Sequence, residues 1–85
     1  MQDVVIFGYE GCRWCKAAEI FFNSLHIPFT YRDVKADPAA KEELYARLDF
    51  GCTVPQIFVG DDHIGGYDQL NDAFHAGRLP VTFGK

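Results

Sequence analysis

Residues 4–16 of the chain read VVIFGYEGCRWCK, an apolar run followed within a few residues by two cysteines three positions apart. The run 4–7 is β-branched and aromatic without alternation, which is typical of a strand buried on both faces of a sheet. If a helix follows the run, Cys12 lies at its N-terminus and Cys15 lies one turn further in. The rest of the chain is interpreted around this strand, turn and helix.

The two cysteines have the layout of a thiol redox site. Cysteines at this spacing can close a small disulfide ring, and the unpaired N–H groups and positive dipole of a helix N-terminus favour a thiolate over a thiol. We therefore predict Cys12 as the nucleophile, with Arg13 beside it, and Cys15 as the resolving thiol. Structural cysteines and half of a zinc site are the alternatives. Zinc needs a second Cys/His pair at short spacing, for which Cys52 and His63 are poorly placed.

Length and composition limit the class of protein. With 85 residues, 48% of them hydrophobic and 15% aromatic, the chain is expected to form one domain, residues 1–85, with its own core. A net charge of -4 without a basic run argues against nucleic acid and anionic membranes as partners. The start has no signal-peptide pattern and no stretch long enough for a membrane span, so we expect a cytoplasmic protein. In that compartment a Cys-X-X-Cys pair is more often catalytic or metal-binding than a structural disulfide.

The first helix is expected to run from residue 13 to about residue 25 and to end before Pro28. Its inward stripe follows from spacings of three and four, with Ile20 and Phe21 widening it. The stripe consists of Cys15, Ala18, Phe22 and Leu25.

A strand over 29–34 follows that helix, which predicts a βαβ unit with parallel strands. Asp37 is the expected N-cap of a second helix and Pro38 its first residue. Leu44 and Leu48 should face inward, and Gly51 should end this helix.

The last third of the chain contains a strand over 53–59, a turn at 60–62, a short strand at 63–64 and a third helix that ends near Gly77. The predicted order is βαβαββα, an α/β fold in which a mixed four-stranded sheet is flanked by three helices. This is a thioredoxin-like architecture.

Three separated segments now resemble one family. Segments 9–15 (YEGCRWC), 53–58 (TVPQIF) and 63–68 (HIGGYD) are similar, in order and spacing, to motifs of dithiol glutaredoxins. The resemblance implies a redox-active disulfide in a glutathione-dependent enzyme that reduces protein disulfides and glutathione mixed disulfides. It also implies glutathione as co-substrate, no tightly bound cofactor, no metal, and a monomer with disulfide-bearing client proteins, ribonucleotide reductase among them.

The same resemblance implies a substrate site around the Thr-Val-Pro segment. Pro55 would be cis and face the disulfide, so that the backbone of Val54 pairs with a substrate cysteine like an added strand. The alternative is a trans proline that begins an edge strand. Thr53 would add polar contacts or cap the loop. Cys52, the unpaired sulfur, lies near the active disulfide or is simply a small loop residue.

The Gly-Gly-Tyr-Asp segment would hold the zwitterionic amino acid end of glutathione. Gly65 and Gly66, followed by the start of a helix, offer backbone donors to a carboxylate, and Asp68 offers an acceptor to an ammonium group. Gly66, Tyr67 and Asp68 are the residues of this segment expected to bind glutathione. Asp68 is also a candidate N-cap of the third helix.

The sequence departs from the family pattern in two ways. Arg13 and Trp14 stand between the cysteines, where Pro-Tyr is usual, and Trp14 is the predicted wall of the substrate groove. Tyr9 occupies a position where many members have a lysine that helps hold the glycyl carboxylate of glutathione. That carboxylate is then expected to contact Arg47 or Arg13 instead.

Two other functions stay open from the sequence. One is a redoxin recharged by a thioredoxin reductase, which the Tyr9 replacement favours. The other is a protein that holds a [2Fe–2S] cluster between two subunits through the first cysteine and bound glutathione, which the missing proline between the cysteines leaves possible.

Overall fold

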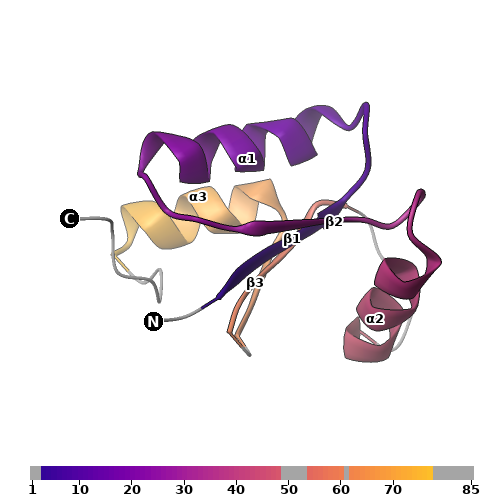
Figure 1. The fold of residues 1–85 in the computed structure, drawn as a ribbon. Coiled ribbons are helices and arrows are strands. Elements are labelled where there is room, and N and C mark those ends of the chain that lie inside the picture. Colours follow the sequence, from indigo (N-terminus) through magenta and orange to yellow (C-terminus); the bar gives the residue numbers. More distant parts are fainter. Residues whose placement is uncertain (1–2, 49–53, 61, 78–85) are drawn as a thin grey trace.

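The computed structural model of the chain describes residues 3–48, 54–60 and 62–77. Figure 1 shows a sheet with α1 and α3 on one face and α2 on the other. The observed order, βαβαββα, confirms the prediction. The elements are β1 (Val4–Gly8), α1 (Arg13–Ser24), β2 (Thr30–Asp33), α2 (Pro38–Leu48), β3 (Gln56–Val59), β4 (Asp62–Gly65) and α3 (Tyr67–His75).

The sheet is mixed, with strand order β2-β1-β3-β4. β1 is parallel to β2 and antiparallel to β3, so it lies in the interior of the sheet. Val4, Ile6 and Phe7 are at most 3% exposed, as expected for a strand covered on both faces. Because β1 and β2 are parallel, their carboxyl ends meet at the same edge, with Gly8 opposite Asp33.

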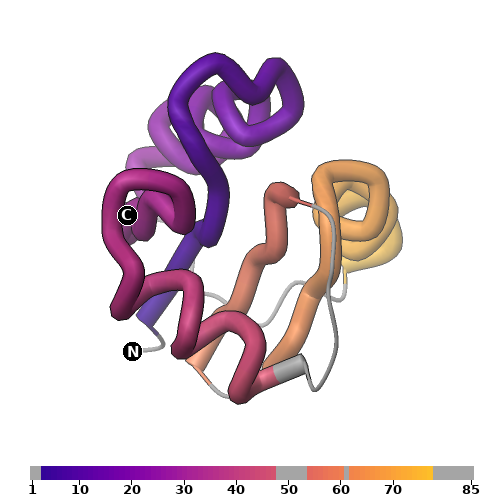
Figure 2. The backbone as a smooth tube through the Cα atoms, turned by 90° about the vertical axis from the view of Figure 1, so that its right-hand side faces the viewer, coloured from indigo at the N-terminus to yellow at the C-terminus, as the bar shows by residue number. Residues whose placement is uncertain are grey.

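Helices cover both faces of the sheet (Figure 2), and each face has its own core. On the α2 face, Phe7 and Phe58 meet edge to face at 5.7 Å, and Leu44 packs with them. On the α1 and α3 face, the larger core consists of Val4, Ile6, Ala18, Phe22, Ile27, Ile57, Val59 and Leu70.

Helix α1 ends at Ser24, close to the predicted end. His26 has a φ of 58°, and the N–H of Ile27 returns to the carbonyl of Phe22 at 3.0 Å, which closes the last turn. Ile27 is buried, so the chain re-enters the core there.

The width predicted for the inward stripe of α1 was partly wrong. Ile20 is 58% exposed, because it lies beyond the edge of the sheet-facing side. Phe21 is half-buried and meets the ring of Phe74 on α3 edge to face at 5.2 Å, so it joins the two helices. Periodicity alone does not distinguish these two neighbours.

Helix α2 begins as predicted. The Asp37 carboxylate accepts the N–H of Ala39 at 3.0 Å, which is an N-cap with Pro38 as the first helical residue. Leu44 is buried as expected. The side chain of Leu48 and the whole of Gly51 lie outside the described residues.

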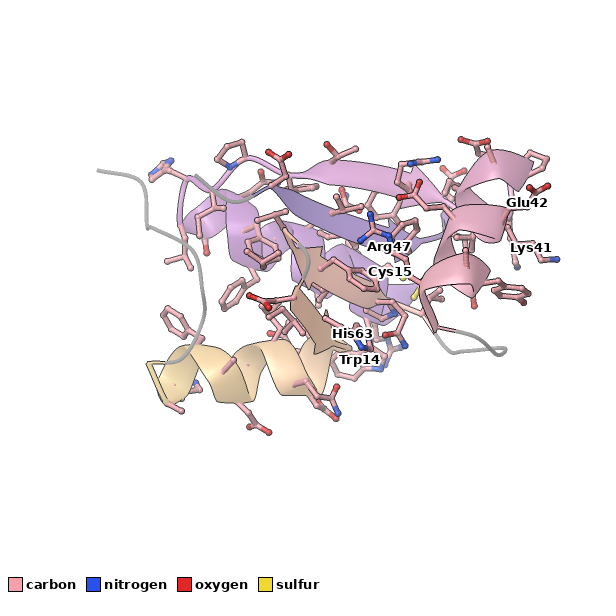
Figure 3. All side chains as sticks on the ribbon, turned by 90° about the horizontal axis from the view of Figure 1, so that it is seen from below. Trp14, Cys15, Lys41, Glu42, Arg47 and His63 are labelled. Atoms are coloured by element: carbon pink, nitrogen blue, oxygen red, sulfur yellow. The ribbon has the colours of Figure 1, made fainter. Side chains whose placement is uncertain are left out.

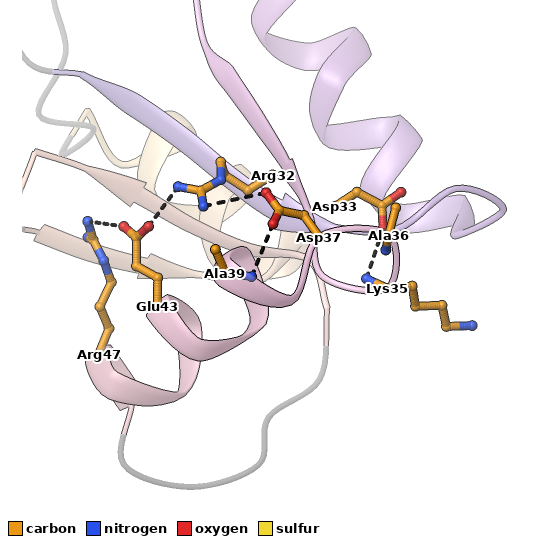
Figure 4. A network of polar contacts seen from close by, with 8 residues as sticks. All are labelled: Arg32, Asp33, Lys35, Ala36, Asp37, Ala39, Glu43 and Arg47. Carbon is orange, nitrogen blue, oxygen red and sulfur yellow. Dashed lines mark hydrogen bonds and ion pairs between the residues drawn. The ribbon is translucent and has the colours of Figure 1, made fainter.

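Ion pairs join α2 to β2 (Figure 4). Arg32 on β2 contacts Glu43 at 2.7 Å and Asp37 at 3.8 Å, and Arg47 contacts Glu43 at 2.9 Å. Burial would raise the pKa of Glu43, but the hydrogen bonds from the two arginines outweigh it and lower that pKa.

Strand β3 is shorter than the predicted 53–59, whereas β4 (Asp62–Gly65) is longer than the predicted 63–64. β3 begins at Gln56, after Val54 and Pro55, because only the later residues pair with β1.

Within the described residues, no helix is long and apolar enough to cross a membrane.

Candidate functional site

The sulfur of Cys12 lies at the start of α1. Cys12 is the N-cap residue with an extended backbone, and its Sγ accepts the N–H of Cys15 at 3.2 Å. Its own N–H donates to the Tyr9 carbonyl at 3.3 Å, which fixes the turn before the helix. The half-exposed sulfur therefore receives a helix N–H donor, an arrangement that suits a negative charge.

Cys15 is only 1% exposed, on the sheet-facing side of α1 (Figure 3). Burial raises its pKa to about 12, and the hydrogen bond with Cys12 adds to the rise. The Tyr9 backbone and the Tyr31 side chain act in the opposite direction. The two thiols thus differ in accessibility as the sequence predicted, one reachable and one buried.

Beside the cysteines, Trp14 forms one wall of a pocket of about 260 Å³, which we call the tryptophan pocket. The indole is 54% exposed and stacks on the ring of Tyr67 at 5.5 Å with 26° between the planes. This contact joins the start of α1 to the start of α3. The pocket is lined by Trp14, Val54, Pro55, Gly66, Tyr67, Asp68 and Gln69.

At the start of α3, Gly66 is the N-cap residue, so the prediction that Asp68 caps this helix was wrong. Asp68 lies in the first turn and its exposed side chain lines the tryptophan pocket. The N–H of Gly66, expected to face a ligand carboxylate, instead donates to the side-chain oxygen of Gln69 at 2.9 Å. Gln69 sits at the third helical position, where such a return bond is common.

The Val54–Pro55 peptide bond is cis, as the resemblance implied. Pro55 is buried, and its carbonyl lies against Gly66. Thr53 and Cys52 lie outside the described residues, so their predicted roles stay predictions.

On the other side of Val54 is a larger pocket, of about 730 Å³, which we call the lysine pocket. The Lys35 ammonium lies 4.1 Å from the centre of the Tyr9 ring, and the Lys41 ammonium lies 5.8 Å from that of Tyr45. The lysine pocket is lined by Tyr9, Val34, Lys35, Pro38, Lys41, Leu44, Tyr45 and Val54.

Lys35 and Lys41 were not predicted from the sequence. Figure 4 shows the Lys35 side chain extending away from Asp33, whose carboxylate accepts the backbone N–H groups of Lys35 and Ala36 at 2.9 Å each. None of the three ion pairs found among the described residues uses either lysine. The usable signal was the parallel pairing of β1 with β2, which brings the residues after Asp33 beside Tyr9.

The two arginines predicted to hold a carboxylate lie elsewhere. Arg13 is exposed at the first position of α1, and it lines neither pocket. Arg47 pairs with Glu43, and its guanidinium lies 4.7 Å from the centre of the Phe58 ring. The structure therefore brings together nine of the predicted site residues and leaves these two apart from the pockets. The nine are Tyr9, Cys12, Trp14, Cys15, Val54, Pro55, Gly66, Tyr67 and Asp68.

Among the residues that the structure describes, no group of three His, Cys, Asp or Glu side chains is arranged to hold a metal ion. The chemistry that these residues can perform is thiol–disulfide exchange, with an accessible sulfur and a buried sulfur adjacent on one helix.

Comparison with known proteins agrees with this site. The family model described as Glutaredoxin matches residues 4–64. Glutaredoxin 1 of Escherichia coli is 39% identical over 72 residues, which are 78% of this chain and 85% of that protein. Glutaredoxin-C4 of Arabidopsis thaliana is 31% identical over 98% of this chain, which spans 63% of the length of the plant protein.

Solved structures give the same result. Glutaredoxin 1 from Francisella tularensis, complexed with cacodylate, has a TM-score of 0.73 and 30% identity over 89% of this chain and 95% of that one. A buckwheat glutaredoxin–glutathione complex has a TM-score of 0.78 and 25% identity over 92% of this chain and 73% of that one. With the family model covering most of its length and the cysteine pair at the start of α1, the chain belongs to the glutaredoxin family of thiol oxidoreductases.

Proposed function

We propose that the protein is a glutathione-dependent thiol–disulfide oxidoreductase that reduces protein disulfides and glutathione mixed disulfides. The observation that carries the proposal is the placement of an accessible Cys12 and a buried Cys15 at the start of α1. Cys12 is hydrogen-bonded to Tyr9, which lines the lysine pocket, and Trp14, between the cysteines, lines the tryptophan pocket. A tripeptide with its thiol in the middle and different charged groups at its ends matches this arrangement.

The reaction proceeds through two sulfurs. The Cys12 thiolate attacks a client disulfide, forms a bond to one client sulfur and releases the other, which takes up a proton. Cys15 then loses its proton and attacks Cys12, so that the second client sulfur leaves and a Cys12–Cys15 disulfide forms. Two glutathione molecules restore the dithiol and leave as oxidised glutathione. A glutathione mixed disulfide on Cys12 can be resolved by a second glutathione without Cys15.

The amino acid end of glutathione suits the tryptophan pocket. The Asp68 carboxylate can accept hydrogen bonds from the γ-glutamyl ammonium, and the first turn of α3 favours the α-carboxylate. Gln69 has to release the N–H of Gly66 before that donor can serve a ligand.

The glycyl carboxylate suits the lysine pocket. Tyr9 removes the usual cation at its own position, but its ring holds the Lys35 ammonium 4.1 Å away, and Lys41 lines the same pocket. Two ammonium groups without a carboxylate partner in the described ion pairs favour an anionic end group there.

The remaining parts of the proposal come from the family. Glutathione would be the co-substrate, and no cofactor would be tightly bound. The clients would be disulfide-bearing proteins, with ribonucleotide reductase as one candidate electron acceptor. A monomer in the cytoplasm is the expected state.

A second candidate function is a redoxin recharged by a thioredoxin reductase. Two observations favour it: Tyr9 replaces a glutathione-binding lysine, and the Gly66 N–H is already bonded to Gln69. Both would weaken glutathione binding.

The test is NADPH oxidation with a small glutathione mixed disulfide, in one arm with glutathione and glutathione reductase and in the other with thioredoxin reductase alone. Turnover only in the glutathione arm supports the proposal, whereas turnover only with thioredoxin reductase supports the second candidate. Silence in both arms contradicts both and leads to anaerobic purification, in which visible absorbance would indicate a [2Fe–2S] cluster.

Two variants test the division between the sulfurs. Cys12→Ser should abolish all turnover, and Cys15→Ser should keep turnover of the glutathione mixed disulfide while losing most protein-disulfide reduction. Equal losses in both variants would refute the separate roles.

A further inference from the structure

The side chain of Tyr31 on β2 meets the buried cysteine above the backbone of Gly8. A Cβ atom placed on Gly8 would lie 2.6 Å from Cys15 Sγ and 2.8 Å from Tyr31 Oη. The sulfur and the phenol oxygen therefore occupy the space that a side chain at position 8 would fill. The Tyr31 hydroxyl now donates to the Tyr9 carbonyl at 3.2 Å, close to the turn that carries Cys12.

The resolving step requires a negative charge at the most buried sulfur of the site. Cys15 has to lose its proton before it attacks Cys12, and a buried thiolate without hydrogen-bond donors is costly. Tyr31 is the side-chain hydroxyl that shares the space above Gly8 with this sulfur.

We propose that Tyr31 is a positioning residue for the resolving step, whose hydroxyl donates a hydrogen bond to Cys15 Sγ as this sulfur becomes a thiolate and attacks the mixed disulfide on Cys12. The inference rests on the proposed function, since it concerns the second sulfur of that reaction. It requires only that the hydroxyl turn from the Tyr9 carbonyl toward the sulfur.

The effects of Tyr31 and Cys15 on each other's pKa agree with this geometry. The Tyr31 side chain lowers the pKa of Cys15, against the larger effect of burial. Burial, followed by the charge of the Cys15 thiolate, raises the pKa of Tyr31 above its ordinary value. The phenol therefore keeps its proton and acts as a donor throughout.

Tyr31 also lines a third pocket, of about 280 Å³, together with Cys12; we call it the cysteine pocket. In the resolving step the Cys15 thiol gives its proton to water and its sulfur bonds to Cys12. The bond between Cys12 and the client or glutathione sulfur breaks, and that sulfur leaves as a thiolate that takes a proton from water. The charged and titratable groups that line this pocket, from α1, β2 and the loop between β1 and α1, are Cys12, Lys16, Glu19, Tyr31, Asp33, Tyr9 and Glu10.

The experiment measures the resolving step without glutathione. Cys12 is loaded with thionitrobenzoate at acid pH, where Cys15 stays protonated, and the pH is then raised in a stopped-flow instrument. Attack by Cys15 releases the coloured thiol. Tyr31→Phe should slow this release about tenfold at neutral pH and move its pH profile upward by about one unit, the effect of one lost hydrogen bond to a charged group.

Two controls separate this role from a structural one. In a Cys15→Ser background, Tyr31→Phe should leave turnover of the glutathione mixed disulfide unchanged. Replacement by 3-fluorotyrosine keeps the shape and gives a stronger donor, so the release profile should move to lower pH.

An unchanged release rate and pH profile in Tyr31→Phe would overturn the proposal. An equal loss of mixed-disulfide turnover in the Cys15→Ser background would also overturn it. Such a loss would show that Tyr31 acts through the Tyr9 carbonyl and the turn that carries Cys12. Because the release assay uses no glutathione, it succeeds or fails independently of whether glutathione is the reductant.

Discussion

Replacing Gly8 by alanine tests how closely the active site is packed. The added Cβ would lie 2.6 Å from Cys15 Sγ, 2.8 Å from Tyr31 Oη and 3.0 Å from Cys15 Cβ, whereas ordinary contacts begin at 3.4 Å. These neighbours cannot withdraw easily, since Cys15 is on a helix packed against the core and Tyr31 is on a paired strand. The substitution should therefore displace both.

The expected cost follows from overpacking. Forcing a methyl group into a filled site costs about 1–3 kcal/mol. Without the clash, alanine in a strand would instead stabilise by about 0.4–1 kcal/mol, because it restricts the unfolded chain. A net loss of about 2 kcal/mol lowers the Tm of a domain of this size by roughly 8–16 °C.

The assay is reversible thermal unfolding of the reduced protein, followed by circular dichroism. A matched comparison is Gly8→Ala in a Cys15→Ala, Tyr31→Phe background, where the sulfur and the phenol oxygen are absent. In that background, the loss of unfolding free energy caused by Gly8→Ala should be smaller by about 1 kcal/mol, which is a typical coupling energy for groups in contact. A neutral or stabilising Gly8→Ala, or an equal cost in both backgrounds, would refute the close approach of these groups.

Four further results are expected. Lys35→Gln should raise the KM for glutathione about three- to tenfold. The KM for glutathione esterified at its glycine should change little, because the ester lacks the carboxylate. Equal effects on both KM values would show that Lys35 does not contact the glycyl carboxylate. The folded pKa of Cys15, about 12, exceeds its ordinary value of 9.0, so the reduced protein should be destabilised as pH rises from about 9 toward 12, and Cys15→Ala should flatten this loss in alkaline unfolding curves. The pKa of Glu43 lies below 4.5, so its ion pairs stabilise the fold above that pH, and this contribution disappears as the pH falls through the lowered pKa. Glu43→Gln should therefore weaken the dependence of the unfolding free energy on acid pH. An unchanged dependence at acid pH would contradict this role of Glu43. Trp14→Ala should cost about 0.5–1.5 kcal/mol through loss of the stack on Tyr67, and a Tm equal to that of the parent protein would show that the contact adds nothing.

Much of the fold could be predicted because local patterns determined it. The unbroken apolar run before the cysteines indicated a central strand, and Asp37 followed by Pro38 located the start of α2. The spacing of Cys12 and Cys15, together with the helix that follows them, was sufficient to predict one accessible and one buried sulfur.

The rest depended on contacts between distant segments. Lys35 faces Tyr9 only because β1 and β2 are parallel in one register, and Tyr31 meets Cys15 only because Gly8 has no side chain. The N-cap of α3 was misassigned because Asp68 is a preferred capping residue by type, whereas the backbone places Gly66 at that position. Arg47 is an exception, because its partner Glu43 lies four residues earlier on the same predicted helix, and this i,i+4 spacing favours the ion pair that the structure shows.

The sulfur of Cys12 has two roles, because the atom that exchanges bonds with clients is also the cap of α1. Changing its covalent partner therefore changes the end of a helix, and oxidation couples to folding in a thermodynamic cycle. The difference in unfolding free energy between the dithiol and disulfide forms must equal the difference in reduction potential between the folded and unfolded chains, and about 1.4 kcal/mol corresponds to about 30 mV. A cap worth about 1 kcal/mol thus shifts the potential by roughly 20 mV. The stability of the helix start is in this sense part of the driving force of the reaction.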